Sequence, residues 1–137
     1  MRMEQVEISD SFMTEFGTRR APPPGQKFFW VQVLIKNMGK DGVNLPAPEH
    51  FSVLYAGAEL KPTYAHRAGH PDYLAQGPNL FPQQELQAWL RFDLPEAAGL
   101  QDLWFIFLPE SAQVGVSASS ADYPWGTDHP TYVWVCQ

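Results

Sequence analysis

Apolar side chains recur at every second position in two long segments of the chain, and each segment predicts a β-strand. Those that share one face of residues 27–37 are Phe29, Val31, Val33 and Ile35. Those that share one face of residues 86–94 are Leu86, Ala88, Leu90, Phe92 and Leu94. Because alternate side chains of a strand point to the same side, we expect both sets to line one dry interior.

Shorter apolar or alternating segments predict further strands. They are residues 5–9, 43–45, 51–55, 59–61, 103–108, 114–117 and 131–136, and the same period continues at Phe12, Thr14 and Phe16. Ten Gly and thirteen Pro exclude long helices and favour turns. Ala56 and Gly57 predict a two-residue hairpin turn, whereas residues 17–25, 63–78 and 119–130 predict loops, the second with room for one helical turn. We therefore predict an all-β fold of seven to nine short strands in two packed antiparallel sheets.

Length and charge narrow the class of protein further. A chain of 137 residues is expected to form one domain with a core of its own. The net charge of −6 is uneven, because residues 1–67 sum to +1 and residues 68–137 sum to −7. An acidic half repels a phosphate backbone, so we expect no nucleic-acid partner.

The cysteine content and the hydropathy of the chain bear on its compartment. Cys136 is the one cysteine, so it forms no disulfide within the chain, and we expect a half-buried thiol there. No apolar run reaches the roughly 18 residues that span a bilayer, which predicts no membrane insertion. The first ten residues lack the apolar stretch of a signal peptide. These residues therefore predict a cytoplasmic protein or a trimmed product of an exported one.

The order of strands and turns resembles a known family. The matching series begins with FWVQVLIKN, the turn NMGKDGVNL and the hairpin FSVLYAGAELKP, and continues with LFP, QELQAWLRFDLP and AAGL. It is similar to the immunoglobulin-like family catalogued as domain of unknown function 4352, over roughly residues 4–110. Gln83 and Gln84 stand where that family has Gly in a turn. Residues 111–137 lie beyond the resemblance and are expected to elaborate a single domain spanning residues 1–137.

The resemblance carries expectations about fold and location. It implies an immunoglobulin-like antiparallel β-sandwich of the kind found in secreted proteins and lipoproteins of bacteria and archaea. It implies no shared reaction and no catalytic residues. An extracellular or cell-surface location follows from the resemblance, while a cytoplasmic one stays open because of the N-terminal residues described above.

One loop contains candidate metal ligands. His66, His70 and Asp72 lie close together in the sequence, and two His four residues apart on a helix can share a zinc ion. Gly69 and Pro71 disfavour a helix at this point. We therefore expect a solvated polar loop here, with no bound metal or cofactor.

Motifs for catalysis are not evident elsewhere in the sequence. The chain contains no G-x-S-x-G elbow, no P-loop and no dinucleotide fingerprint. Cys136 has no sequence signature of an activating His. We predict a protein that is not an enzyme, and a metal-assisted hydrolase that uses the His66 loop stays as an alternative.

The abundance of Trp and Tyr suggests a binding face. The strand period places Trp30 and Trp89 on the side of their strands that faces away from the core. The other members of the expected face are Tyr123, Trp125, Tyr132 and Trp134. Either loops and the C-terminal residues cover this face, or it is an exposed platform that stacks on sugar rings or anchors a protein interface.

The combined observations predict a non-catalytic interaction domain. Its expected partner is another protein or a second copy of the chain, bound through the aromatic face. The alternative is a carbohydrate- or cell-envelope-binding module that uses Trp30, Trp89, Trp125 and Trp134.

Overall fold

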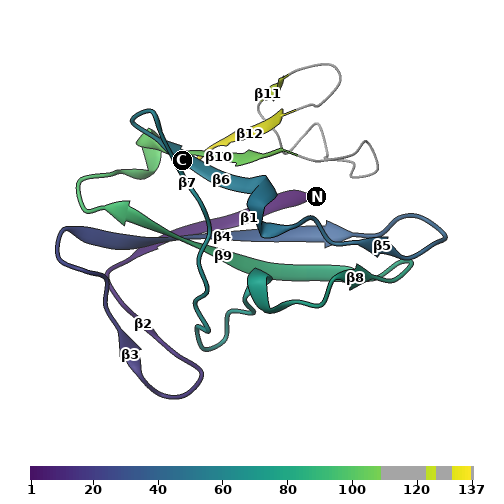
Figure 1. Cartoon of the computed structure of the whole chain (residues 1–137), viewed down its shortest axis with the longest axis horizontal. Helices are drawn as coiled ribbons and strands as arrows, with labels where there is room; N and C mark the ends of the chain where they lie inside the picture. Colours follow the sequence, from purple (N-terminus) through teal and green to yellow (C-terminus); the bar gives the residue numbers. More distant parts are fainter. Residues whose placement is uncertain (109–122, 126–130, 137) are drawn as a thin grey trace.

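The computed structural model describes residues 1–108, 123–125 and 131–136, and it is all-β (Figure 1). Its strands are β1 (Arg2–Ser9), β2 (Phe12–Met13), β3 (Arg19–Arg20), β4 (Gln26–Lys36), β5 (Val43–Asn44), β6 (Phe51–Tyr55), β7 (Ala58–Leu60), β8 (Asn79–Leu80), β9 (Glu85–Pro95), β10 (Trp104–Phe107), β11 (Tyr123–Trp125) and β12 (Thr131–Val135). The described residues also contain three short 3-10 helices, which are η1 (Pro48–His50), η2 (Tyr73–Ala75) and η3 (Leu100–Asp102).

The two segments with the clearest alternation form neighbouring strands of one sheet. This antiparallel sheet has the order β1-β4-β9. Phe29 lies opposite Phe92 and Val31 lies opposite Leu90 in the register of β4 and β9, so the two apolar faces are continuous. The prediction of a dry interior is confirmed for eight of the nine side chains, which are at most 6% exposed. The exception is Leu86, which is partly buried and packs against the same core.

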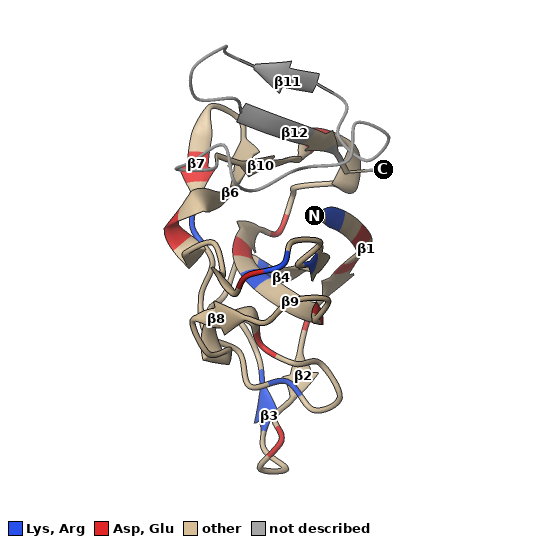
Figure 2. Cartoon of the chain, turned by 90° about the vertical axis from the view of Figure 1, so that its right-hand side faces the viewer, with Lys and Arg blue, Asp and Glu red and all other residues tan. Residues whose placement is uncertain are grey.

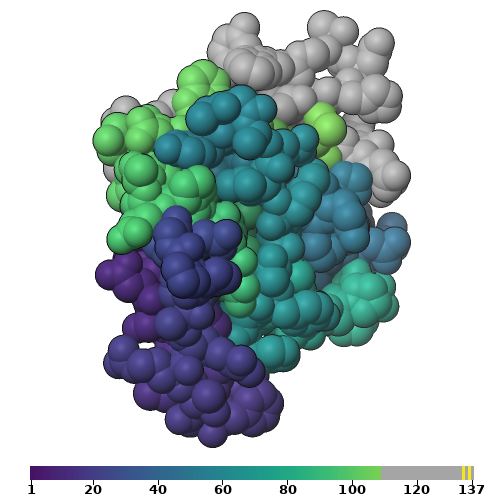
Figure 3. All heavy atoms as spheres, turned by 60° about the vertical axis from the view of Figure 1, so that its left-hand side comes forward, coloured from purple at the N-terminus to yellow at the C-terminus, as the bar shows by residue number. Residues whose placement is uncertain are grey.

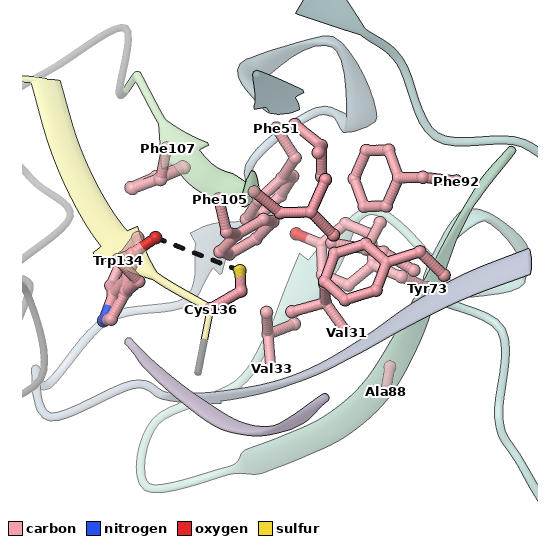
Figure 4. Close-up of a cluster of buried hydrophobic side chains, with 14 of the residues drawn as sticks. Val31, Val33, Phe51, Tyr73, Ala88, Phe92, Phe105, Phe107, Trp134 and Cys136 are labelled. Atoms are coloured by element: carbon pink, nitrogen blue, oxygen red, sulfur yellow. Dashed lines mark hydrogen bonds between the residues drawn. The ribbon is translucent and has the colours of Figure 1, made fainter. Parts of the chain in front are cut away.

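A second antiparallel sheet, with the order β11-β12-β10-β6-β7, contributes side chains to the same core. Phe51 and Val53 of β6 and Phe105 and Phe107 of β10 are fully buried, in one cluster with the buried faces of β4 and β9 (Figure 4). The Phe51 ring stacks on Phe107 with centroids 5.0 Å apart. Burying each such side chain is worth about 1.5–3 kcal/mol, so this cluster is the main source of stability.

Cys136 belongs to this core. Its side chain is fully buried, and its Sγ lies 4.0 Å from the carbonyl oxygen of Trp134 (Figure 4). Residue Trp134 is buried in the same cluster, with its ring 5.4 Å from that of Phe105. The thiol is therefore more deeply buried than the sequence indicates.

The hairpin turn and the short helix that the sequence predicts are both present. Ala56 and Gly57 connect β6 to β7 with φ values of 48° and 81°, the left-handed pair that a two-residue hairpin turn requires. Residues 63–78 contain the one short helix η2, within an otherwise irregular loop. No helix in the described part of the chain is long and apolar enough to cross a membrane.

Two expected loops contain strands. β3 lies within residues 17–25 and pairs with β2, and β11 lies within residues 119–130 and pairs with β12. The predicted strand at residues 114–117 lies outside the described residues. Phe16, expected to continue the buried period of Phe12 and Thr14, is 80% exposed because the chain reverses direction at Gly17.

Tyr73 gives the stability of the fold a specific pH dependence. Burial raises the pKa of the Tyr73 hydroxyl above its ordinary value of 10, and the hydroxyl donates to the Pro46 carbonyl at 2.7 Å. The unfolded chain releases this proton above pH 10 and the folded chain retains it. The stabilising contribution is therefore complete below pH 10 and is lost as the pH rises further, at about 1.4 kcal/mol per pH unit.

We expect denaturant unfolding between pH 9 and pH 11.5 to show this loss. The variant Tyr73→Phe should have a flatter dependence of the unfolding free energy on pH, although it loses the bond to Pro46. Tyr64→Phe leaves Tyr73 in place, so its unfolding free energy should depend on pH as steeply as that of the wild-type protein. Equal slopes in all three proteins would contradict the assignment.

Candidate functional site

A second, smaller apolar cluster lies on the opposite face of the three-stranded sheet. Its members are Phe12, Phe28, Trp30 and Trp89, and each is at most 7% exposed. The Phe12 ring meets Phe28 and Trp30 edge to face, at centroid distances of 5.0 and 5.1 Å. Trp30 also donates from Nε1 to the Ser9 hydroxyl at 2.9 Å. The buried indole therefore has its hydrogen bond satisfied.

Two segments cover this cluster, namely the β2–β3 hairpin and the loop of residues 63–72. The loop follows the edge of β9, where the Thr63 amide donates to Arg91 and the Trp89 amide donates to Pro71. The hairpin in turn pairs with the loop, since the Ala68 amide donates to Met13 at 2.9 Å. Both segments are thus tied to the sheet by backbone hydrogen bonds.

Arg67 fixes the loop to the sheet with its side chain. Its guanidinium lies 4.6 Å from the Trp30 ring centroid and binds Glu7 of β1 through two hydrogen bonds of 2.9 and 3.3 Å. The Arg67 side chain is 16% exposed. A planar guanidinium can stack on an indole and bind a carboxylate at two points simultaneously, which an ammonium group cannot.

Arg91 has the equivalent role on β9. Its guanidinium lies 5.0 Å from the Phe28 ring, donates twice to Asp93, and donates to the Tyr64 carbonyl at 2.7 Å. The aromatic cluster is therefore closed by two arginines whose charges are each paired with a carboxylate.

The candidate metal ligands do not converge. Asp72 is 7% exposed, and its carboxylate accepts the amides of Leu74 and Ala65, so it caps η2 and shapes the loop. His70 lies on Trp89 at 4.8 Å and donates to the Ala68 carbonyl, whereas His66 contacts Glu15. Among the described residues, no group of three or more His, Cys, Asp or Glu side chains is placed to hold a metal ion.

The expected aromatic platform needs correction. Trp30 and Trp89 do lie on the face away from the main core, but the hairpin and loop bury them. Trp134 is buried in the main core. These three side chains form no exposed platform, because a strand period says which way a residue points and not what covers it. The side chains of Tyr123, Trp125 and Tyr132 lie outside the described residues.

A different set of rings is exposed. Phe16 at the tip of the β2–β3 hairpin is 80% exposed, and Tyr64 and Met13 are 52% and 45% exposed. His66 lies between the two aromatic residues, with its ring 5.5 Å from Tyr64 and 6.3 Å from Phe16. We call Met13, Glu15, Phe16, Arg19, Tyr64 and His66 the hairpin surface. The hairpin projects from the body of the molecule (Figures 1 and 3).

Hydrogen bonds hold this projection in one shape. The Thr14 amide donates to Thr18 at 2.8 Å, the Gly17 amide donates to Thr14 at 3.0 Å, and the Thr14 hydroxyl accepts from Thr18. The Glu15 amide donates to the His66 carbonyl at 2.9 Å. Residue His66 has a φ of 53°, a region that His occupies more readily than most residues. The hairpin surface is thus ordered by contacts within the chain.

The sequence gives little signal for this surface. Phe16 falls on the period of two buried positions, and Tyr64 lies in a segment without any period. The combination of Gly17 with the three polar residues Glu15, Thr14 and Thr18 is typical of a turn and is the one indication that the strand ends there.

The charges around the hairpin are mixed. Strand β3 consists of Arg19 and Arg20 and is blue in Figure 2. Both residues are exposed, and neither has a carboxylate partner among the described residues. Arg19 donates to the Ser11 hydroxyl. Glu15 carries a negative charge at the tip of the hairpin, and its carboxylate lies 3.3 Å from the His66 ring. The hairpin surface therefore presents both signs of charge beside exposed rings.

Removal of the Arg67 side chain should loosen the cover. We expect Arg67→Ala to lower the unfolding free energy by about 1–3 kcal/mol, because it leaves Trp30 without its stacked cation and Glu7 without its partner. Arg67→Lys should recover only part of this loss. The matched control is Arg2→Ala, since Arg2 pairs with Glu4 but is 55% exposed, and its loss should cost below about 0.5 kcal/mol. Equal costs for Arg67 and Arg2 in urea unfolding would contradict this role.

Comparison with known proteins identifies two solved structures with a similar fold. No protein-family model matches the chain, and no curated protein sequence matches it. Two solved structures from Bacillus subtilis are similar. The yjhA protein has a TM-score of 0.59 and 13% identity, over 86% of this chain and 79% of its own. The ycdA protein, described as a "putative lipoprotein", has a TM-score of 0.50 and 17% identity over 96% of this chain. This chain spans only 36% of the length of ycdA. At these identities the likeness extends to the all-β fold alone.

Proposed function

We propose that the chain is a non-catalytic interaction domain that binds a protein partner through the hairpin surface. The observation that supports it most directly is Phe16, a large apolar side chain that is 80% exposed at the tip of an ordered projection. Exposing such a ring to water has no benefit for the fold, because burial of apolar area is what stabilises a domain. Because the exposed Tyr64 lies on the other side of the His66 ring, a partner that covers Phe16 can bury two aromatic rings together.

The neighbouring residue types support a protein partner. Aromatic residues, Met and Arg are enriched at the centres of protein interfaces, and the hairpin surface combines Phe16, Tyr64, Met13 and Arg19. Backbone hydrogen bonds hold the hairpin in shape before binding, which lowers the entropy lost on association.

We further infer an immunoglobulin-like sandwich and a place in the family that the sequence resembles. Support comes from the two antiparallel sheets that share one core and from the series of strands and turns between residues 27 and 62. The description of ycdA as a "putative lipoprotein" supports an extracellular or cell-surface location.

Site-specific photo-crosslinking tests the binding surface. A photoreactive phenylalanine analogue at position 16, in the source cells, should form a discrete crosslinked product. The matched control is position 81, because Phe81 is also exposed, at 64%, but lies beside β8, away from the hairpin. We expect products from position 16 and not from position 81. Products from neither position, or equally from both, would refute the proposal.

The carbohydrate alternative has a distinct signature. If the hairpin surface stacks on sugar rings, the wild-type protein should be retained on one class of immobilised glycan and Phe16→Ser should not. Such retention without a protein crosslink would replace the protein partner with a glycan.

A further inference from the structure

The hairpin surface carries a charge pattern that is complementary to itself. Met13 lies directly opposite Arg19 in the β2–β3 register, and both are exposed, so they share the outward face of the hairpin. Thr14, between Met13 and Glu15, is 6% exposed and faces inward. Glu15 is exposed next to this face, where its backbone pairs with His66. Met13 and Arg19 therefore share one face of the projection, with Glu15 exposed beside it. The His66 ring, which contacts Glu15, lies next to the rings of Phe16 and Tyr64.

We propose that the protein bound at this surface is a second copy of the chain, related by a two-fold axis, with Arg19 of each copy facing Glu15 of the other. This proposal rests on the proposed function and names its partner. In a two-fold interface the same patch is used by both subunits, so a patch that contains one cation, one anion and an apolar centre can satisfy itself. Phe16 and Tyr64 of the two copies would then be removed from water together.

The charges of the hairpin surface favour a second copy of the chain over an anionic membrane as the partner. Arg19 has a hydroxyl but no carboxylate partner among the described residues, so it has donors available for a carboxylate. The Glu15 side chain is 58% exposed, so it remains accessible beside His66. An anionic membrane would attract Arg19 and Arg20 but repel Glu15, which lies beside them on the hairpin surface. The mixture of signs therefore favours another copy over a lipid surface.

The small size of the hairpin surface limits the expected affinity of the dimer. A stable interface removes about 800 Å² from each partner. One short hairpin and the adjoining loop supply fewer residues than such an interface contains. The association is therefore expected to be reversible and in the micromolar range or weaker, with fast exchange.

Reciprocal charge reversal tests the arrangement by analytical ultracentrifugation. The wild-type protein should change from monomer to dimer as its concentration rises through the micromolar and low millimolar range. Arg19→Glu and Glu15→Arg should each weaken the dimer by more than about tenfold, because each places two like-charged pairs in the interface. An equimolar mixture of the two single variants should dimerise again, since each contact then joins opposite charges.

Control variants separate this contact from effects on folding. Lys40→Glu makes the same change of charge as Arg19→Glu at an exposed residue of the β4–β5 turn, and it should leave the dimer unaffected. Phe16→Ser should abolish the dimer while circular dichroism and the unfolding transition remain those of a folded protein. If the single variants failed to dimerise because they were destabilised, mixing them would not restore the dimer. Recovery of the dimer in the mixture therefore reports the contact between two copies.

Three outcomes would overturn the inference. They are a wild-type protein that stays monomeric at all concentrations, single variants that dimerise as the wild type does, and a mixture that stays monomeric. If the protein is monomeric but position 16 crosslinks to a different protein, the inference fails while the proposed function stands. If position 16 crosslinks to nothing and the monomer instead sediments with vesicles of phosphatidylserine and phosphatidylcholine in a Phe16-dependent way, the partner is a membrane and both proposals fail.

Discussion

The burial of β4 on both of its faces is the constraint on which the rest of the structure depends. One face places Phe29, Val31 and Val33 in the core shared with the second sheet, and the other places Phe28 and Trp30 among the aromatic side chains of the smaller cluster. The three-stranded sheet contributes only one of its faces to the main core. The second face must therefore be covered by connecting segments, or two large rings would lie in water.

The need for this cover explains the hydrogen bonds and ion pairs on this side of the sheet. The segments that lie over Trp30 and Phe28 are a short hairpin and an irregular loop, whose backbone groups and charges need partners. Asp72, Arg67 and Arg91 provide these partners through amides, carboxylates and ring faces. What looks in the sequence like a loop of candidate ligands is thus the set of polar contacts that holds a cover in place. The exposed rings of Phe16 and Tyr64 lie at the outer end of the same cover.

The sequence was sufficient for those parts of the fold that depend on local period and turn chemistry. The inward positions of β4, β6 and β9 follow from alternation, and the Ala56–Gly57 turn follows from the backbone freedom of glycine. The site was not predictable in the same way. Whether Trp30 is a platform or a core residue depends on residues 12–20 and 63–72 folding over it, and these contacts span up to 60 positions in sequence. Phe16 continues a strand period although the chain turns there, so the pattern alone placed it wrongly.

The edges of the three-stranded sheet determine how copies of this protein can meet. Along β9 the amides of Thr63 and Trp89 already join the loop to the strand. On β1 the pairing with β4 shifts register between Met3 and Gln5. Such an irregularity bends an edge strand and makes it a poorer partner for an additional strand. Growth of this sheet by backbone pairing is therefore disfavoured at both borders, which protects a chain rich in aromatic side chains against amyloid-like stacking.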